Sequence, residues 1–207
     1  MSGITVIGAG GHAKVVIALC RAAGVRVDRV VDDDLSRDGT TLLDVPVAAP
    51  VREHLPRGAR AIIAIGNNDT RARVAAEFDD VVGEWVTLIH PRAYVDPLAR
   101  VGVGVVVFAG AVVQVDAAIG AHSIINTGVT VDHDVVIGEA VHLAPGVHLA
   151  GSVIVDDGAF VGVGVAVIPG KRIGARSTVG AGAAVVTDIA ADVVAVGVPA
   201  RVIRSLI

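Results

Sequence analysis

Three of the chain's seven histidines, His133, His142 and His148, fall within 16 residues, and Asp134 directly follows the first of them. Clustered histidines can bind a metal ion, and a neutral imidazole near pH 7 can act as a general base. A carboxylate beside such a ring raises its basicity and fixes its tautomer. Which chemistry applies depends on the elements that position these side chains.

A period of six residues runs through the second half of the chain. Every sixth position from Val95 to Val185 is Val, Ile or Leu, in 16 of 16 cases. This period fits neither an α-helix nor a hairpin meander, and is typical of a triangular coil of three short strands and turns. Coils of 18 residues would stack in parallel at roughly 4.8 Å around a narrow interior, which suits a chain rich in valine with 2% aromatic residues. We therefore expect a parallel β-helix over about residues 89–190.

Before the repeat, strand and helix patterns alternate. "ITVIGAG" and "ARAIIAIG" are typical of buried strands, whereas "GHAKVVIALCRAAG" and "DTRARVAAEF" are typical of helices, the second with Asp69 or Thr70 as its N-cap. This order predicts a small α/β domain with a Rossmann-like parallel sheet over residues 1–88, followed by the β-helix domain with a C-terminal exit segment over 89–207.

A glycine-rich turn joins the first strand to the first helix. Gly8-x-Gly10-x-x-Ala13 is close to the dinucleotide-binding fingerprint, and Asp32–Asp34 lie near its expected acidic position. Backbone N–H groups at the helix N-terminus can bind phosphate oxygens. The unit is short for a complete dinucleotide domain, so a mononucleotide-type ligand is favoured, with a turn that binds nothing as the alternative.

Composition limits the partners and the compartment. The net charge of −4 without a basic block gives no sign of a nucleic-acid or membrane-surface partner. The single Cys20 favours a reducing compartment, and the glycine-broken N-terminus is typical of a strand rather than a signal peptide. The 15 uncharged residues between Arg100 and Asp116 are too few for a membrane helix of about 20. We expect a cytoplasmic protein.

The 18-residue coil converts spacing into position. His133 and Gly151 are 18 residues apart and should stack on one edge of the prism, whereas His142 lies nine residues from both. His142 therefore cannot share a site with His133 on one prism, although it could across neighbouring copies. No two histidines are 18 apart, so we expect no metal site.

The repeat spacing and the closing "VAVGVPARVI" resemble the hexapeptide-repeat acyltransferases, which are trimers of left-handed β-helices whose exit segment typically leads into a short helix. "GAGGHAKV", "DDD", "IAIGNN" and "HDVVIGEAVHLAPG", in that order, resemble the branch that N-acetylates nucleotide-linked 4-amino-4,6-dideoxy sugars, with sialic-acid O-acetyltransferase-like proteins as near relatives. The resemblance implies a homotrimer that uses acetyl-CoA as cosubstrate, with sites between neighbouring prisms and the nucleotide-sugar between the two domains.

The same resemblance implies roles for individual residues. His133 matches the catalytic base and Asp134 the acidic residue after it. Asn126 matches an active-site asparagine, and Gly151 matches a glycine whose N–H faces the thioester oxygen. The acetyl-CoA contacts are His142, Val163 and Ala181. The nucleotide-sugar contacts are Gly10, Gly11, His12, Asp32, Asp33 and Gly66, with Lys14 and Asn68 as additions. No role falls on His54, His90, His122 or His148.

Three alternatives stay open at this point. A sugar O-acetyltransferase could use the same residues on a hydroxyl, and a non-catalytic trimer could bind nucleotide-sugars only. A zinc enzyme resembling the γ-class carbonic anhydrases would need converging histidines. Catalysis by the His–Asp pair also carries a geometric condition: adjacent strand side chains point in opposite directions, so Asp134 can contact the His133 ring only at a turn corner.

Overall fold

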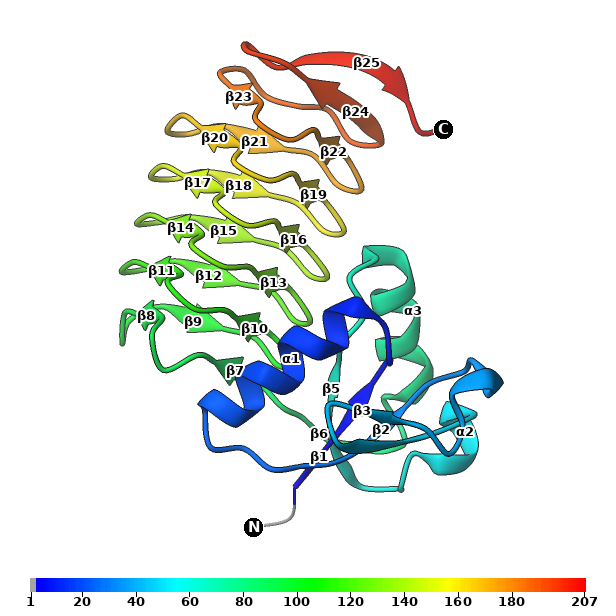
Figure 1. Ribbon diagram of the computed structural model, residues 1–207. Coiled ribbons are helices and arrows are strands. Elements are labelled where there is room, and N and C mark those ends of the chain that lie inside the picture. Colours follow the sequence, from blue (N-terminus) through cyan, green and yellow to red (C-terminus); the bar gives the residue numbers. More distant parts are fainter. Residues whose placement is uncertain (1–2) are drawn as a thin grey trace. The chain divides into compact units, whose positions relative to one another are not determined.

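The computed structural model describes residues 3–207, which form two compact units divided between His90 and Pro91 (Figure 1). The first unit is built on a sheet of order β3-β4-β2-β1-β5-β6, in which only β3 runs antiparallel to its neighbour. Its strands are β1 (Ile4–Ile7), β2 (Val27–Val31), β3 (Thr41–Leu42), β4 (Val45–Ala48), β5 (Ala59–Ile63) and β6 (Val82–Trp85), followed along the chain by β7 (Leu88–Ile89). The chain builds one side of β1 first and then returns to build the other, so the strand order reverses between β1 and β5.

Two helices cover this sheet, α1 (Gly11–Ala22) and α3 (Asn68–Phe78) (Figure 1). Ile7 and Ile63 pack with Phe78 of α3 on one face. Right-handed crossovers that run in opposite directions from the centre place α1 on the other face, where it buries Ile17 and Cys20. The shorter α2 (Val51–His54) and a 3₁₀ turn (Leu35–Arg37) complete the unit.

The N-cap expected for α3 was wrong. Asn67 is the cap: its backbone is extended, and its side-chain oxygen accepts a hydrogen bond from the Thr70 N–H at 2.9 Å. The helix begins earlier than the apolar pattern indicated, so Asp69 lies in the first turn, where its charge complements the helix dipole.

The second unit is a parallel β-helix of two-residue strands stacked in three ladders (Figure 1). Partners in adjacent coils are 18 residues apart, as in Val113↔Val131 and Leu149↔Val167, which confirms the predicted coil length. One ladder has β10 (Val106–Val107), β13 (Ile124–Ile125), β16 (His142–Leu143), β19 (Phe160–Val161) and β22 (Thr178–Val179). The second has β8 (Tyr94–Val95), β11 (Val112–Val113), β14 (Thr130–Val131), β17 (His148–Leu149), β20 (Ala166–Val167) and β23 (Ala184–Val185). The third has β9 (Arg100–Val101), β12 (Ala118–Ile119), β15 (Val136–Ile137), β18 (Ile154–Val155) and β21 (Arg172–Ile173).

The interior of the prism is filled by the aliphatic residues of the six-residue period. All 16 belong to the core cluster or pack against it, and only Val95 and Val101, in the first coil, are partly buried. Small or β-branched residues four positions further along fill the corners. Two of these are buried hydroxyls, Ser123 and Ser177, each of which donates to a backbone carbonyl. The narrow interior thus excludes large rings, as the composition indicated.

Three columns of corners join the strands, and each corner turns through one residue with a left-handed backbone. One column has Asp116, Asp134 and Ser152 at this place, with φ near +60°. Asp and Asn tolerate this conformation better than most non-glycine residues. The residue before it is carried outward at the edge of the prism.

The β-helix ends in a hairpin. β24 (Val193–Val196) joins the stack, and β25 (Arg201–Ser205) pairs with it antiparallel. The exit segment of the resembled family typically leads into a short helix, whereas here a strand follows. Its Val202 and Ile203 are β-branched and favour an extended backbone on the edge that β24 offers. No helix within residues 3–207 is long and apolar enough to cross a membrane.

Candidate active site

His133 and Asp134 occupy one corner of the prism, between β14 and β15. The left-handed backbone of Asp134, with φ of 58°, turns its carboxylate toward the preceding residue, and Oδ2 lies 2.8 Å from His133 Nδ1. The geometric condition for this pair is therefore met at a corner rather than along a strand. Asp132 accepts the His133 backbone N–H at 2.8 Å, which further orders the turn.

The two carboxylates shape the titration of the imidazole. The hydrogen bond to Asp134 raises the pKa of His133 most, the negative charges of Asp132 and Asp134 raise it further, and partial desolvation opposes them. A carboxylate can only accept, so Nδ1 carries a proton and Nε2 holds the lone pair of the neutral ring. The side chain is 55% exposed. This arrangement suits a base that takes a proton from a molecule arriving from solvent.

Gly151 lies directly beneath that ring in the next coil. A Cβ at Gly151 would lie 2.6 Å from both Cε1 and Nε2 of His133. The backbone does not require glycine there: in steps of six from Val103 to Ala181, the residue before the left-handed corner position is glycine at 151 alone. The predicted stacking of His133 on Gly151 is thus confirmed, and space for the ring accounts for the glycine.

A second pair of predicted residues meets on another part of the prism. The side-chain nitrogen of Asn126, at the end of β13, lies 3.2 Å from Nε2 of His142 in β16. Phe160, next in the same ladder, meets the His142 ring edge-on, with centroids 5.2 Å apart. Asn126 lies at a different corner from His133, with β14 between them. The structure therefore divides the predicted catalytic residues of one chain between two edges.

Val163 and Ala181 lie 18 residues apart at the corner column that follows the β13–β16–β19 ladder, which is the edge of Asn126. Within residues 3–207, their backbone N–H groups and that of Gly151 have no acceptor, because the following residue makes the ladder hydrogen bond at each corner. Main-chain donors at the edge of the prism are what the predicted pantetheine and thioester contacts would need. Their roles stay predictions.

Histidine alone does not make a metal site here. Across residues 3–207, no group of three or more His, Cys, Asp or Glu side chains could hold an ion. His148 instead contacts Thr130 Oγ1 through Nδ1 at 2.9 Å, across adjacent coils.

In the first unit, the glycine-rich turn follows β1 at the carboxyl edge of the sheet, beside the point where the strand order reverses. This is the usual ligand position in such sheets. Added Cβ atoms at Gly10, Gly11 and Gly66 would meet nothing within 4 Å. The first turn of α1 has no acidic residue and no side-chain cap, which leaves an electropositive helix end open to phosphate. His12 is half-buried in that turn and Lys14 is exposed.

Asp32 holds the turn itself. Its Oδ2 accepts the Ala9 N–H at 2.5 Å, and its Oδ1 accepts the Asp34 N–H at 2.8 Å. Arg37, which sequence reasoning missed, donates to the Ala9 carbonyl at 2.9 Å. Both sides of Ala9 are thus clamped, which gives Asp32 a structural role besides any ligand contact. The only available signal for Arg37 was a basic residue five positions after the acidic one.

The remaining predicted contacts have local partners. Asp33 Oδ1 accepts the Val51 N–H at the start of α2, at 3.1 Å. Arg71 is buried, which lowers the pKa of its guanidinium to about 10, and it donates to the Gly66 carbonyl and to Asn68 Oδ1. The loop after β5 is therefore ordered from beneath by Arg71, another residue that the sequence did not single out.

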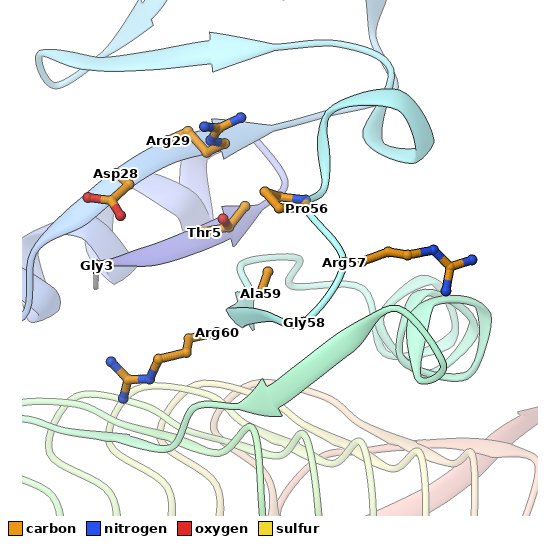
Figure 2. Close-up of a pocket in the computed structure, with 9 residues that line it drawn as sticks. All are labelled: Gly3, Thr5, Asp28, Arg29, Pro56, Arg57, Gly58, Ala59 and Arg60. Atoms are coloured by element: carbon orange, nitrogen blue, oxygen red, sulfur yellow. The ribbon is translucent and has the colours of Figure 1, made fainter. Parts of the chain in front are cut away.

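A shallow hollow of about 250 Å³ lies at the opposite, amino edge of this sheet (Figure 2). Gly3, Thr5 and Asp28 line it together with three arginines. Arg57 and Arg60 extend away from it (Figure 2), and Arg60 pairs with Glu84 at 2.6 Å. The hollow is therefore separate from the predicted nucleotide-sugar residues.

A β-helix of hexads with a His–carboxylate corner, preceded by a small α/β unit with a phosphate-type turn, defines a hexapeptide-repeat acyltransferase with a nucleotide-binding N-terminal domain. Residues 3–78 match the family described as the PglD N-terminal domain. UDP-N-acetylbacillosamine N-acetyltransferase of Bacillus subtilis (strain 168) is 42% identical over 114 residues, 53% of this chain and 52% of that protein. The match spans about half the length of this curated relative.

Two solved structures match nearly the whole chain. A histidine-to-asparagine mutant of perosamine N-acetyltransferase from Caulobacter crescentus, in complex with CoA and GDP-perosamine, is 43% identical with a TM-score of 0.92, over 99% of this chain and 98% of that one. The acetyltransferase domain of PglB from Neisseria gonorrhoeae FA1090, in complex with acetyl coenzyme A, is 34% identical with a TM-score of 0.90, over 97% and 98%. The chain belongs to this family of hexapeptide-repeat sugar N-acetyltransferases.

Proposed function

We propose that this protein is an acetyl-CoA-dependent N-acetyltransferase that acts on the 4-amino group of a nucleotide-linked 4-amino-4,6-dideoxy sugar. The observation that carries the proposal is the corner pair of His133 and Asp134 above Gly151, which presents a basic Nε2 beside an unengaged backbone N–H. The similarity to the perosamine enzyme, which is described with CoA and GDP-perosamine, supports the substrate class.

In this reaction the sugar nitrogen forms an amide bond with the acetyl carbon, and the thiol of CoA leaves. An ammonium group cannot attack, so His133 takes the proton from nitrogen through Nε2, while Asp134 stabilises the imidazolium that forms. The Gly151 N–H donates to the oxyanion of the tetrahedral intermediate. No covalent acyl-enzyme is required, and Cys20 is buried in α1 with its pKa raised by burial to about 11.

The binding roles are also part of the proposal. Val163 and Ala181 offer main-chain N–H groups to the pantetheine arm, and His142 and Asn126 border the same edge. On the first unit, Gly10, Gly11 and His12 bind the phosphates, with Asp32, Asp33 and Gly66 completing the nucleotide-sugar site, and Lys14 and Asn68 beside it.

A homotrimer is proposed because one chain holds only half of the acetyl-transfer site on each edge. His133, Asp134 and Gly151 share one corner column, whereas Asn126, Val163 and Ala181 share another. A neighbouring copy would bring the second set to the first. We propose the cytoplasm as the compartment, which agrees with one unpaired, buried cysteine.

The test is thiol release from acetyl-CoA with a panel of UDP-, GDP- and dTDP-linked 4-amino-dideoxy sugars. Turnover with one member should fall roughly 10²–10⁴-fold in His133→Asn, the usual weight of a general base, and stay near normal in His148→Asn. Near-normal activity of His133→Asn would refute the assignment. Silence across the panel with acetyl-CoA still bound would indicate a hydroxyl acceptor, and loss of acetyl-CoA binding would indicate a non-catalytic trimer.

A further inference from the structure

The hydrogen bonds around Asn126 determine which way its amide points. The backbone N–H of Thr127 lies 2.8 Å from the Asn126 oxygen, and the Thr127 hydroxyl lies 3.4 Å from it. A backbone N–H can only donate, so the oxygen of the amide must face Thr127. The NH₂ group then faces His142, where Nε2 lies 3.2 Å away.

That orientation fixes the state of the imidazole. An amide NH₂ can only donate, so Nε2 of His142 is the acceptor and its lone pair is engaged. A neutral imidazole carries one proton, which must then lie on Nδ1. Phe160 packs edge-on against the ring at an interplanar angle of 88°, and β13 and β19 flank β16 in register, so the ring is held in its plane.

The two predicted site histidines are therefore prepared for opposite tasks. His133 has Nδ1 bound to a carboxylate, which leaves the lone pair of Nε2 to accept a proton. His142 has Nε2 bound to a donor, which leaves the N–H of Nδ1 as the only polar hydrogen of its ring. Both are Nδ1–H tautomers, but one serves as acceptor and the other as donor.

We propose that Asn126 is a positioning residue that holds His142 as the neutral Nδ1–H tautomer, so that His142 takes part in acetyl transfer as a hydrogen-bond donor and cannot substitute for His133 as base. The inference deepens the proposed function and rests on it. The group that such a donor recognises is a carbonyl oxygen, which acetyl-CoA carries in its thioester and in the amides of its pantetheine arm.

The tautomer can be measured without any substrate. In the full-length chain labelled with ¹⁵N-histidine, two-bond proton–nitrogen ring correlations distinguish Nδ1–H, Nε2–H and imidazolium, and His142→Phe identifies the signals of His142. We expect the Nδ1–H pattern for wild-type His142. The Nε2–H pattern, or a pattern averaged between tautomers, would overturn the proposal, and this wild-type result decides even if a variant fails to fold.

Asn126→Asp replaces the donor with a carboxylate, so Nε2 should gain a proton and the His142 pattern should change to Nε2–H or imidazolium. Thr127→Val keeps the orienting backbone N–H and should leave the pattern unchanged. By calorimetry with acetyl-CoA, Asn126→Asp should bind roughly 2–10-fold more weakly, as expected for one lost hydrogen bond. A changed tautomer with unaltered acetyl-CoA affinity would overturn the donor role. Absence of thiol release in the wild type would instead refute the proposed function and leave the tautomer result intact.

Discussion

Gly151→Ala is the sharpest perturbation of the proposed base, because it leaves every catalytic side chain in place. Its added Cβ would lie 2.6 Å from Cε1 and Nε2 of His133. Ordinary contacts of this kind begin near 3.4 Å, so the ring must retreat by about 0.8 Å. Alanine already occupies the equivalent corner position at Ala175, so the backbone accepts the substitution.

A displacement of that size is large for catalysis and small for stability. A misplacement of about 1 Å at a reacting group can cost roughly 10²-fold, and the same movement would disturb the 2.8 Å contact between His133 and Asp134. The ring is 55% exposed and can move into solvent, so we expect a stability change within about 0.5 kcal/mol. Gly151→Ala should therefore lower kcat roughly 10²-fold at an almost unchanged Tm.

The assay is steady-state thiol release with the sugar identified from the panel, together with thermal unfolding of the same preparations. Because both changes act on one ring, Gly151→Ala should add little further loss in a His133→Asn background. Ala175→Ser is the matched control, a small addition at the same kind of corner on another edge. Wild-type kcat in Gly151→Ala, or full additivity with His133→Asn, would show that the ring above Gly151 is not the base.

Four further results are expected. Asp134→Asn removes the main cause of the raised His133 pKa, so the acid limb of the kcat/KM profile should move to lower pH, while Asp116→Asn, at the same place one coil earlier, should leave the limb where it is. Val163→Pro deletes one N–H at a corner whose column already accepts Pro145, and should weaken acetyl-CoA binding roughly 2–10-fold by calorimetry, whereas Ala175→Pro should not. Arg37→Ala releases one side of the Ala9 clamp and should raise KM for the nucleotide-sugar with kcat nearly unchanged; an unchanged KM would refute the clamp. Dialysis against a chelator should leave thiol release intact, and loss restored by zinc would revive the metal alternative.

The β-helix could be predicted almost in full from the sequence because its rule is local and repeated. One buried aliphatic residue in every six decides the coil length, and the coil length then decides which residues stack, as His133 does on Gly151. The hairpin at the end was not predictable in the same way. There the period of 18 shortens, as in Thr178↔Val194, and β25 is chosen by the open edge of β24 rather than by the repeat.

The first unit shows what single-residue patterns leave out. Asn67 rather than Asp69 or Thr70 caps α3, because backbone conformation selects among neighbouring polar residues that look alike in sequence. Arg37 and Arg71 order the loops after β1 and β5 through backbone carbonyls, and such contacts leave no residue-type signature at the partner. The predicted ligand positions are identifiable from glycines and acidic residues, whereas the side chains that hold them are not.

The repeat also explains why a transferase site can be built on so regular a frame. Strand positions are constrained on both sides, since one residue fills the core and the next lies in a ladder, but the corner residue before the left-handed turn is free to vary. In this chain that position holds Thr127, His133, Gly151, Val163 and Ala181, which are the proposed base, its glycine platform, the proposed acyl-CoA donors and the residue that orients Asn126. Corners of one column differ by 18 residues and corners of different columns cannot meet on one prism. Functional residues placed in two columns therefore require a second copy, so the periodicity that builds the core also argues that the site is shared between subunits.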